Sequence, residues 1–241
     1  MWELISTYKY LSVVALGLGP VALAYYLSPD QKCMMCLSGS LLCLMMPGVV
    51  IYEGEYWSPT RLLPGAPGVE DFLLGFSIGS LTWLAMIWPS RNQAYLRLVW
   101  TTFLSRFLLM TAASTLGIAL LTSYLHLSAI VATILTQFAI VGVIFWMRPA
   151  YQPLFWQAVL IFVPYYFLGH FLASQVIPDY GAMWTGVPIL GLTWQGLPII
   201  DELLWIISFM SYPLVLAFAA DLNFTRPYPT KSSGRSPRGA G

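Results

Sequence analysis

The chain has 241 residues, of which 58% are hydrophobic and only 9% are charged. A soluble domain carries about a quarter charged residues, so this composition excludes an ordinary soluble globular protein. The formal net charge of +1 gives no reason to expect nucleic-acid binding. The long, continuously apolar runs predict membrane-spanning helices and not the short alternating segments of a membrane barrel.

Seven apolar runs are long enough to cross a membrane, since a spanning helix needs roughly 20 such residues. The first run is predicted to remain in place as a signal anchor. The connection 89–106 mixes charged with aromatic residues and is expected to lie partly in the membrane interface. The tail is rich in Pro, Ser, Gly, Lys and Arg, which predicts disorder. The predicted spans are 8–27, 34–52, 72–88, 107–124, 128–146, 154–176 and 203–222.

The charged residues are divided unevenly between the two ends of these spans. An odd number of spans places the termini on opposite sides, and the basic residues gather on the side of the C-terminus. The positive-inside rule then predicts a cytoplasmic C-terminus and an extracytoplasmic N-terminus. The basic residues assigned to the C-terminal side are Lys32, Arg91, Arg97, Arg106, Arg148, Arg226, Lys231, Arg235 and Arg238. The acids assigned to the N-terminal side are Glu3, Glu53, Glu55, Glu70, Asp71, Asp179, Asp201 and Glu202.

One stretch of the chain occurs twice, at 57–80 and at 184–211. Aligning the pair Glu70-Asp71 with the pair Asp201-Glu202 also aligns a tryptophan, a proline and two serines in each copy. A self-match of this kind predicts a duplicated structural unit. In each copy, two adjacent carboxylates stand where an apolar helix begins. The other matched positions are Trp57 with Trp184, Leu62 with Ile189, Pro67 with Pro198, Ser77 with Ser208, and Ser80 with Ser211.

The duplication and the span count together predict an all-α integral membrane protein of 3+1+3 organisation, with two parallel three-helix repeats joined by a linker helix. Three-helix units joined directly would place their motifs on opposite membrane faces, and the extra helix 107–124 restores a common orientation. The four carboxylates could then converge on one cavity. The predicted units are a first repeat at 1–90, a linker at 91–125, a second repeat at 126–222 and a basic tail at 223–241.

The acidic pairs are the strongest candidates for a chemical role. A single acid in a first helical turn would carry little meaning, because such acids commonly complement the helix dipole. Adjacent acids at matched positions of a repeat, next to apolar spans, favour a functional interpretation. Coupled carboxyl groups titrate as a set, so one can hold a proton while another is ionised. Glu70, Asp71, Asp201 and Glu202 are therefore candidate general acids and bases.

Aromatic residues near the motifs are candidates for stabilising a carbocation through their π faces, although most aromatic residues in such a chain belong to the interfacial belt. A histidine in the sixth span could exchange protons, but a lone histidine in a bundle more often serves packing or hydrogen bonding. These weaker candidates are Trp57, Trp184, Trp194, Trp205 and His170.

Two short patterns have structural interpretations. Cys33 and Cys36 have CxxC spacing, but no second pair or histidine cluster completes a metal site, so the start of a helix is the favoured interpretation. Gly75 and Gly79 form a GxxxG pattern in the third span, which predicts close helix packing. The sequence therefore predicts neither a metal nor a cofactor.

The repeated motif resembles the integral-membrane lycopene cyclase domain. That family occurs as a heterodimer of small subunits or as a fused tandem, and this chain has the length of the fused form. The family motif is Pro-x-Glu-Glu/Asp, and the matching acids here are Glu70-Asp71 and Asp201-Glu202. The sequence departs from it in two ways. The family proline falls on Gly68 and Ile199, one residue after the actual Pro67 and Pro198, and the second pair begins with Asp.

The resemblance implies cyclisation of a linear isoprenoid without net redox change. A carboxyl group would protonate a terminal alkene, a six-membered ring would close, and a carboxylate would deprotonate the cation. Lycopene is the default substrate, with another carotenoid or a terpenoid prenyl chain as a close variant. The implied partners are this hydrophobic substrate and neighbouring biosynthetic membrane enzymes, and the oligomeric state stays open.

Two other classes of protein stay open. Small sugar carriers and their PQ-loop relatives share a 3+1+3 topology, but they use a Pro-Gln dipeptide, which does not occur in this chain. Their substrate paths carry polar side chains at mid-membrane, whereas the polar groups of this sequence are expected to gather at one face. The third class is an assembly partner that retains the fold without activity.

Overall fold

The chain folds into a bundle of membrane-length helices, as the apolar runs predict. This computed structural model describes residues 8–62, 65, 67–91, 95–96, 98–186, 188–189 and 191–223. Within these residues, seven helical segments are long and apolar enough to cross a membrane. This is the architecture of a multi-pass membrane protein. The segments are α2 (Lys9–Leu27), α3 (Lys32–Met45) with the 3₁₀ helix η1 (Met46–Tyr52), α4 (Val69–Ile87), α5 (Trp100–Leu125), α6 (Ala129–Met147), α7 (Gln152–Val176), and α8 (Ile199–Phe209) with α9 (Ser211–Ala219).

Short elements connect the helices at both ends of the bundle. Strand β1 (Tyr95–Leu96) pairs antiparallel with β4 (Leu222–Asn223), and β2 (Thr193–Trp194) pairs antiparallel with β3 (Leu197–Pro198). The first pair ties the connection before α5 to the end of the last helix. The remaining 3₁₀ turns are η2 (Trp88–Ser90), η3 (Pro149–Tyr151) and η4 (Tyr180–Met183).

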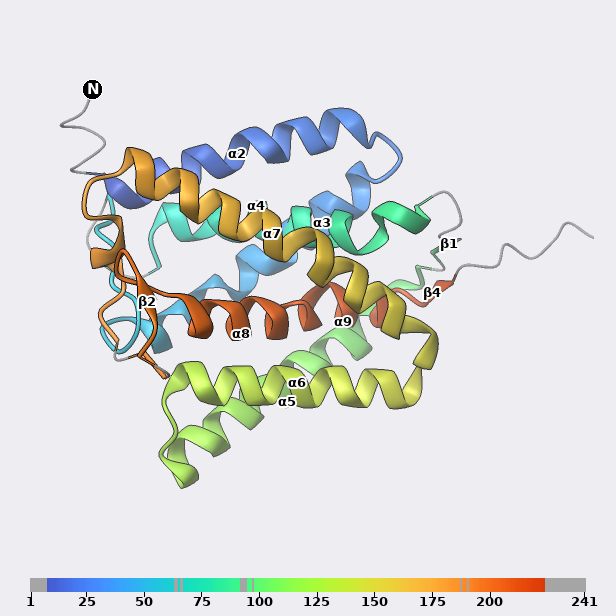
Figure 1. Cartoon of the computed structure of the whole chain (residues 1–241). Helices are drawn as coiled ribbons and strands as arrows, with labels where there is room; N and C mark the ends of the chain where they lie inside the picture. The colour runs from blue at the N-terminus through green and yellow to red at the C-terminus, as the bar shows by residue number, and fades with distance from the viewer. Residues whose placement is uncertain are drawn as a thin grey trace, which may run out of the picture.

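Successive spans run in alternating directions, so the two ends of the described chain lie at opposite ends of the bundle (Figure 1). Helices α2, α4, α6 and α8 all begin at the end where β2 lies, on the left of the view. We call this the acidic end, formed by those helix starts and by the loops 53–68 and 177–198. Both acidic pairs therefore enter the bundle from the same end, as the sequence predicts.

The helices that carry the acidic pairs are the most buried spans of the bundle. Helix α4 packs against both α2 and α3, and α8 packs against both α6 and α7. Helix α4 also contacts α7 and α9, which joins the two groups of helices. Helices α5 and α7 expose most of their surface. A carboxylate at the start of α4 or α8 is consequently carried into the protein interior and away from the lipid-facing surface.

Small residues bring α3 and α4 into close contact, which confirms the packing prediction for Gly75 and Gly79. A Cβ atom on Gly79 would lie 2.8 Å from the carbonyl oxygen of Ser38, and one on Gly75 would lie 2.8 Å from Met46 Cγ. The Ser38 hydroxyl donates to the Gly79 carbonyl oxygen at 2.6 Å, and Ser80 donates to the Met35 carbonyl oxygen at 3.0 Å. The close approach thus lets serine side chains join the two helices.

Several helices begin earlier than the apolar runs predict, because the first turn of a helix can hold polar residues that lie before the apolar run. Helix α8 begins at Ile199 and not at residue 203, and α4 begins at Val69 and not at residue 72. Helix α5 begins at Trp100 and not at residue 107, so the last part of the connection 89–106 is helical. The seventh span is divided at Met210 into α8 and α9. Glu3, Arg97 and the tail residues 224–241 lie outside the described residues.

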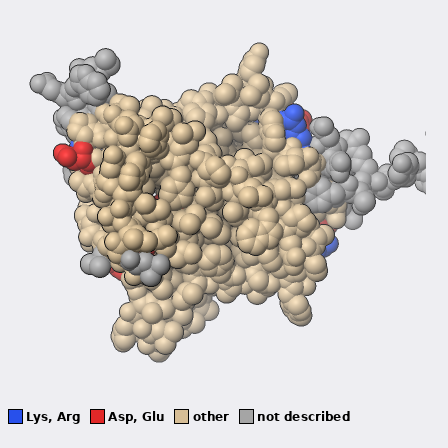
Figure 2. All heavy atoms as spheres, in the orientation of Figure 1, with Lys and Arg blue, Asp and Glu red and all other residues tan. Residues whose placement is uncertain are grey.

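The other end of the bundle carries basic residues that pair with Asp221. Arg148 lies 2.8 Å from this carboxylate and Arg106 lies 3.8 Å from it. Arg106 also donates to the Phe218 carbonyl oxygen at 3.2 Å, so its side chain reaches the end predicted for it. Basic atoms are visible at that end of the surface and acidic atoms at the other (Figure 2).

Candidate functional site

The four acids of the repeated motif are buried in the first turns of α4 and α8. Glu70 is 0% exposed, Asp71 and Asp201 are 1% exposed, and Glu202 is 4% exposed. Adjacent residues of a helix point about 100° apart, yet both acids of each pair are buried. Both are buried because the loops of the acidic end fold over the helix starts. The acids therefore depend on protein groups, and hardly on water, for their hydrogen bonds.

Asp71 is the centre of a buried ion-pair network. Its carboxylate accepts hydrogen bonds from the Tyr10 hydroxyl at 2.7 Å, from the Gly68 backbone N–H at 2.6 Å and from Arg61 Nε at 2.8 Å. The other guanidinium nitrogens of Arg61 donate to both oxygens of Glu53, at 2.9 and 2.8 Å. The Arg61 side chain is only 4% exposed. A bidentate pair of this kind fixes the geometry of both partners.

The carboxylates of Glu53 and Asp71 keep Arg61 positively charged. Burial by itself would lower the pKa of Arg61, but the hydrogen bonds and negative charges of Glu53 and Asp71 outweigh burial and raise the pKa above its ordinary value. Arg61 therefore stays positively charged in its buried position, and Asp71 has a permanent cationic partner.

Glu202 lies in a pocket of aromatic side chains. Its Oε1 accepts hydrogen bonds from the Tyr56 hydroxyl at 3.1 Å and from Trp184 Nε1 at 2.6 Å. Its Oε2 accepts a hydrogen bond from the Tyr166 hydroxyl at 2.5 Å. Among the described residues, no lysine or arginine forms an ion pair with Glu202 or Asp201. Among the described residues, the side-chain donors to Glu202 are thus neutral aromatic groups.

Further rings complete this surrounding, which we call the aromatic pocket. The ring of His170 lies 4.3 Å from that of Tyr166 and 5.6 Å from that of Trp184, between centroids. The hydroxyl group of Tyr180 lies 2.5 Å from His170 Nδ1. Burial and the neighbouring Glu202 charge both raise the pKa of the Tyr56 phenol, so this group remains a hydrogen-bond donor. The aromatic pocket consists of Tyr56, Tyr166, His170, Tyr180, Trp184 and Trp205.

The first acids of the two pairs have matching backbone contacts. Glu70 Oε1 accepts a hydrogen bond from the Leu62 N–H at 2.5 Å. The carboxylate of Asp201 accepts one from the Ile189 N–H, at 3.2 Å to Oδ1 and 3.0 Å to Oδ2. Leu62 and Ile189 are the residues that the sequence alignment of the two copies places at the same position. Each first acid therefore ties its helix start to the loop before it.

The two copies also meet through their first residues. Trp57 and Trp184 form an isolated antiparallel backbone bridge. The N–H groups of Ser58 and Thr185 donate across this contact to the carbonyl oxygens of Met183 and Tyr56, at 2.8 and 3.0 Å. The acidic end is held together by this contact between loops that are far apart in the sequence.

The structure groups the predicted site residues differently from the single cavity that we expected. Asp71 and Glu202 have separate hydrogen-bond partners, so the acids form two centres at one end of the bundle. Trp57 packs edge-to-face on Tyr10 at 4.9 Å, beside the first centre. Trp184, Trp205 and His170 belong to the second. Trp194 stacks on Phe171 at 5.8 Å and makes no hydrogen bond to an acid.

Sequence reasoning missed Tyr10, Glu53, Tyr56, Arg61 and Tyr166. The tyrosines carry no local signal, because Tyr10 lies 61 residues before Asp71 and Tyr166 lies 36 residues before Glu202. Arg61 did carry a signal. It is one of two basic residues on a side with eight acids, and a lone cation among many acids predicts an ion pair.

Gly68 contributes its backbone N–H to the first centre and leaves room for its neighbours. Replacing Gly68 by proline should remove the N–H that donates to Asp71, and should crowd two site residues. A Cβ atom there would lie 2.7 Å from Arg61 Cδ and 2.9 Å from Glu70 Oε2. We expect a loss of about 1–3 kcal/mol of stability, measured by thermal unfolding in detergent. Gly142→Ala is the control, because no atom lies within 4 Å of its Cβ position. Equal unfolding temperatures for both variants would contradict this role of Gly68.

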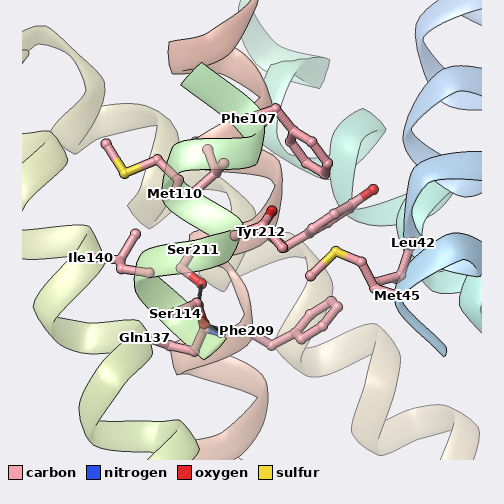
Figure 3. A pocket seen from close by; sticks show the side chains of 12 residues that line it. Leu42, Met45, Phe107, Met110, Ser114, Gln137, Ile140, Phe209, Ser211 and Tyr212 are labelled. Carbon is pink, nitrogen blue, oxygen red and sulfur yellow. Dashed lines mark hydrogen bonds between the residues drawn. The ribbon is translucent and has the colours of Figure 1, made fainter. Parts of the chain in front are cut away.

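A second group of polar residues lies inside the bundle, away from the acids. A cavity of about 50 Å³ lies between α3, α5, α6 and α9. Gln137 donates from Nε2 to Ser114 Oγ at 3.0 Å, and the Ser211 hydroxyl donates to the Gln137 carbonyl oxygen (Figure 3). This volume suits a few water molecules. The expectation that polar groups gather only at one face is therefore wrong.

Cys33 and Cys36 occupy the first turn of α3, and both are exposed. Within the described ranges, no three His, Cys, Asp or Glu side chains are grouped so that they could hold a metal ion. Comparisons with protein-family models, with curated proteins and with solved structures found no match to this chain. The function is consequently argued from the geometry of the two acidic centres.

Proposed function

We propose that this chain is a membrane-embedded isoprenoid cyclase that closes a six-membered end ring on a linear polyene. The observation that carries the proposal is the aromatic pocket around Glu202, in which a buried carboxyl group accepts hydrogen bonds from two phenols and an indole and has no described cationic partner. An enzyme of this class must stabilise a carbocation and then remove a proton from it. A carboxylate and aromatic faces supply both functions.

The position of the pocket also fits an apolar substrate. Helices α8 and α9 form one of the most buried spans, and Glu202 lies in its first turn. A polyene dissolved in the membrane could present its end to this region without crossing water. The first centre supplies further carboxyl groups at the same end of the bundle. The proposal therefore assigns the acid–base chemistry to Glu70, Asp71, Asp201 and Glu202.

The proposed reaction is a non-redox isomerisation. The donor carboxyl O–H bond breaks as the π electrons of a terminal alkene form a new C–H bond. The resulting cation is attacked by the π electrons of an internal alkene, which closes the ring. An acceptor carboxylate then removes a proton, and the electrons of that C–H bond become the ring double bond. The acceptor releases a proton and the donor takes one up, so neither oxidant nor reductant is consumed.

The 3+1+3 repeat is part of this proposal. Three findings support it, namely the bridge between Trp57 and Trp184, the matching backbone contacts of Glu70 and Asp201, and the contacts of α4 and α8 with both other spans of their own units. The first unit would hold α2, α3 and α4, and the second α6, α7 and α8–α9, with α5 as the linker.

Pigment chromatography of lycopene-accumulating bacteria that express the chain tests the proposed function. Cyclic carotenes are expected, and the position of the ring double bond would show which proton is removed. Unchanged lycopene, with the protein confirmed in the membrane, would contradict carotenoid cyclisation. Terpenoid prenyl substrates would then be tested in the same way. Failure of both substrate classes to cyclise would overturn the proposal.

The Gln137 network favours a small transporter as a second candidate. Polar side chains at mid-membrane often mark a substrate path, and Ser114, Gln137 and Ser211 come from three different helices. The acids do not line this cavity, so the two functions depend on different residues. Uptake of a labelled sugar into vesicles, lost in Gln137→Ala and retained in Glu202→Gln, would support the transporter and contradict the cyclase.

The proposed membrane orientation has the acidic end outside and the C-terminus in the cytoplasm. A reporter fused after Gly241 is expected to be active in the cytoplasm, because Lys32, Arg91 and Arg148 all lie at the opposite end from the acidic end. The same reporter fused after Met1 serves as the control and should be extracytoplasmic. Asn223-Phe224-Thr225 is a glycosylation sequon. Glycosylation of Asn223 in a eukaryotic host would place this end outside the cytoplasm and contradict this orientation.

A further inference from the structure

Glu70 differs from the other three acids because one of its oxygen atoms has no hydrogen-bond partner among the described residues. The residue is completely buried, and Oε1 accepts the N–H of Leu62. Oε2 is buried without a hydrogen bond among the described residues. An ionised carboxylate accepts hydrogen bonds at both oxygens, and burying one of them bare is costly. A neutral carboxyl group avoids burying a bare charge, with Oε1 as the acceptor of the Leu62 N–H and the proton on Oε2.

The charges near Glu70 favour the same protonation state. Arg61 is the cation of this centre, and it already pairs with two carboxylates, Glu53 and Asp71. These two negative charges exceed its single positive charge by one. Ionising Glu70 would add a second uncompensated negative charge to a buried region, which is unfavourable. Glu70 itself takes part in no ion pair with a described residue.

The other three acids have a hydrogen-bond donor at each of their carboxyl oxygens. Asp71 accepts three hydrogen bonds, one of them from the Arg61 guanidinium. Glu202 also accepts three, divided between its two oxygens. Asp201 receives the Ile189 N–H at both of its oxygens. The absence of a partner at one buried oxygen therefore distinguishes Glu70 within the set.

We propose that Glu70 is the proton-bearing acid of the site, with its transferable proton on Oε2, and that Arg61 is the positioning residue that pairs with Asp71 and leaves the proton on Glu70. The inference rests on the proposed cyclase, in which this proton is delivered to the terminal alkene. The transfer breaks the Glu70 O–H bond, leaves its electron pair on the carboxylate and forms the C–H bond from the alkene π electrons.

Infrared spectroscopy of the full chain in detergent tests this assignment without any substrate. A neutral carboxyl group has a C=O stretching band that a carboxylate lacks. At neutral pH the unmodified protein should show such a band, and Glu70→Gln should lose it completely. Glu202→Gln and Glu55→Gln should keep it, since Glu55 is exposed. Coinciding spectra of the unmodified protein and Glu70→Gln in this region would overturn the inference.

Variants of Arg61 test the positioning role. In Arg61→Gln, Asp71 loses its cation, and a second neutral carboxyl band is expected, which Asp71→Asn should remove in the double variant. Arg61→Lys retains the charge and should keep the single band. An unchanged spectrum in folded Arg61→Gln would refute the role of Arg61. If that variant does not fold, the comparison with Glu70→Gln still decides the location of the proton.

The test of the Glu70 protonation state can fail or succeed independently of the test of the cyclase function. If Glu70 is neutral but the protein cyclises no isoprenoid, the protonation assignment stands and the proposed cyclase function is wrong. Cyclic products together with an ionised Glu70 would uphold the cyclase and place the donor on another acid, which overturns this inference.

Discussion

Replacing Glu202 by glutamine should reduce cyclic product by about 10²–10³-fold, the usual effect of removing a group that stabilises charge in a transition state. The carboxylate is the only described negative charge among the rings of the aromatic pocket, and it is the proposed acceptor of the final proton. A neutral amide can neither balance the cation electrostatically nor accept that proton. Product formed per unit of folded protein, measured by chromatography, gives the effect.

This variant should also be less stable. Tyr56, Trp184 and Tyr166 all donate to Glu202, and an amide offers one acceptor oxygen where the carboxylate offers two. We expect a cost of about 1–3 kcal/mol from the donor that loses its acceptor. Glu55→Gln is the matched control, because exposed Glu55 accepts one hydrogen bond among the described residues, from the Ala129 N–H, and a glutamine oxygen can accept it as well. Undiminished product from folded Glu202→Gln would contradict the role of this acid.

Replacing Glu70 by glutamine should lower the rate by about 10²–10⁴-fold with almost no loss of stability, because a general acid contributes a factor of this size. The glutamine carbonyl oxygen can still accept the Leu62 N–H, and its amide nitrogen would occupy the place of Oε2. A large loss of rate in a normally folded protein is characteristic of a chemical role. The measurements are the rate of product formation and the unfolding temperature in detergent.

The double variant Glu70→Gln with Asp201→Asn tests whether the reaction needs the first acids of the two pairs. We expect product to be absent and the protein to remain folded, since both amides keep an acceptor for the loop N–H groups. If the double variant forms product at the normal rate, the acid assignment is wrong.

The sequence predicted the parts of the fold that depend on local composition. Seven spans follow from apolar run length, and the common entry side of Glu70 and Asp201 follows from span parity. The contact between α3 and α4 follows from Gly75 and Gly79. The alignment of the two copies also anticipated that Leu62 and Ile189 would occupy matching positions, and they contact matching acids.

The arrangement of the site could not be predicted, because it depends on contacts between distant segments. Tyr10 reaches Asp71 from the first span, and Tyr166 reaches Glu202 from the sixth. Neither contact has a signature in the sequence around either partner. The division into two centres has the same origin, since Arg61 pairs with Asp71 while no described cation pairs with Glu202. Asp71 and Glu202, which match when the two sequence stretches are aligned, thus have different surroundings.

Deuterium incorporation during cyclisation tests the central claim most directly. Membranes that contain the protein would be supplied with lycopene, or with another linear isoprenoid that it converts, in heavy water. Cyclisation initiated by a carboxyl proton predicts a product isomeric with the substrate that carries one solvent-derived deuterium for each ring closed. A cyclic product without deuterium, or one whose hydrogen count differs from that of the substrate, would contradict acid-initiated cyclisation by this chain.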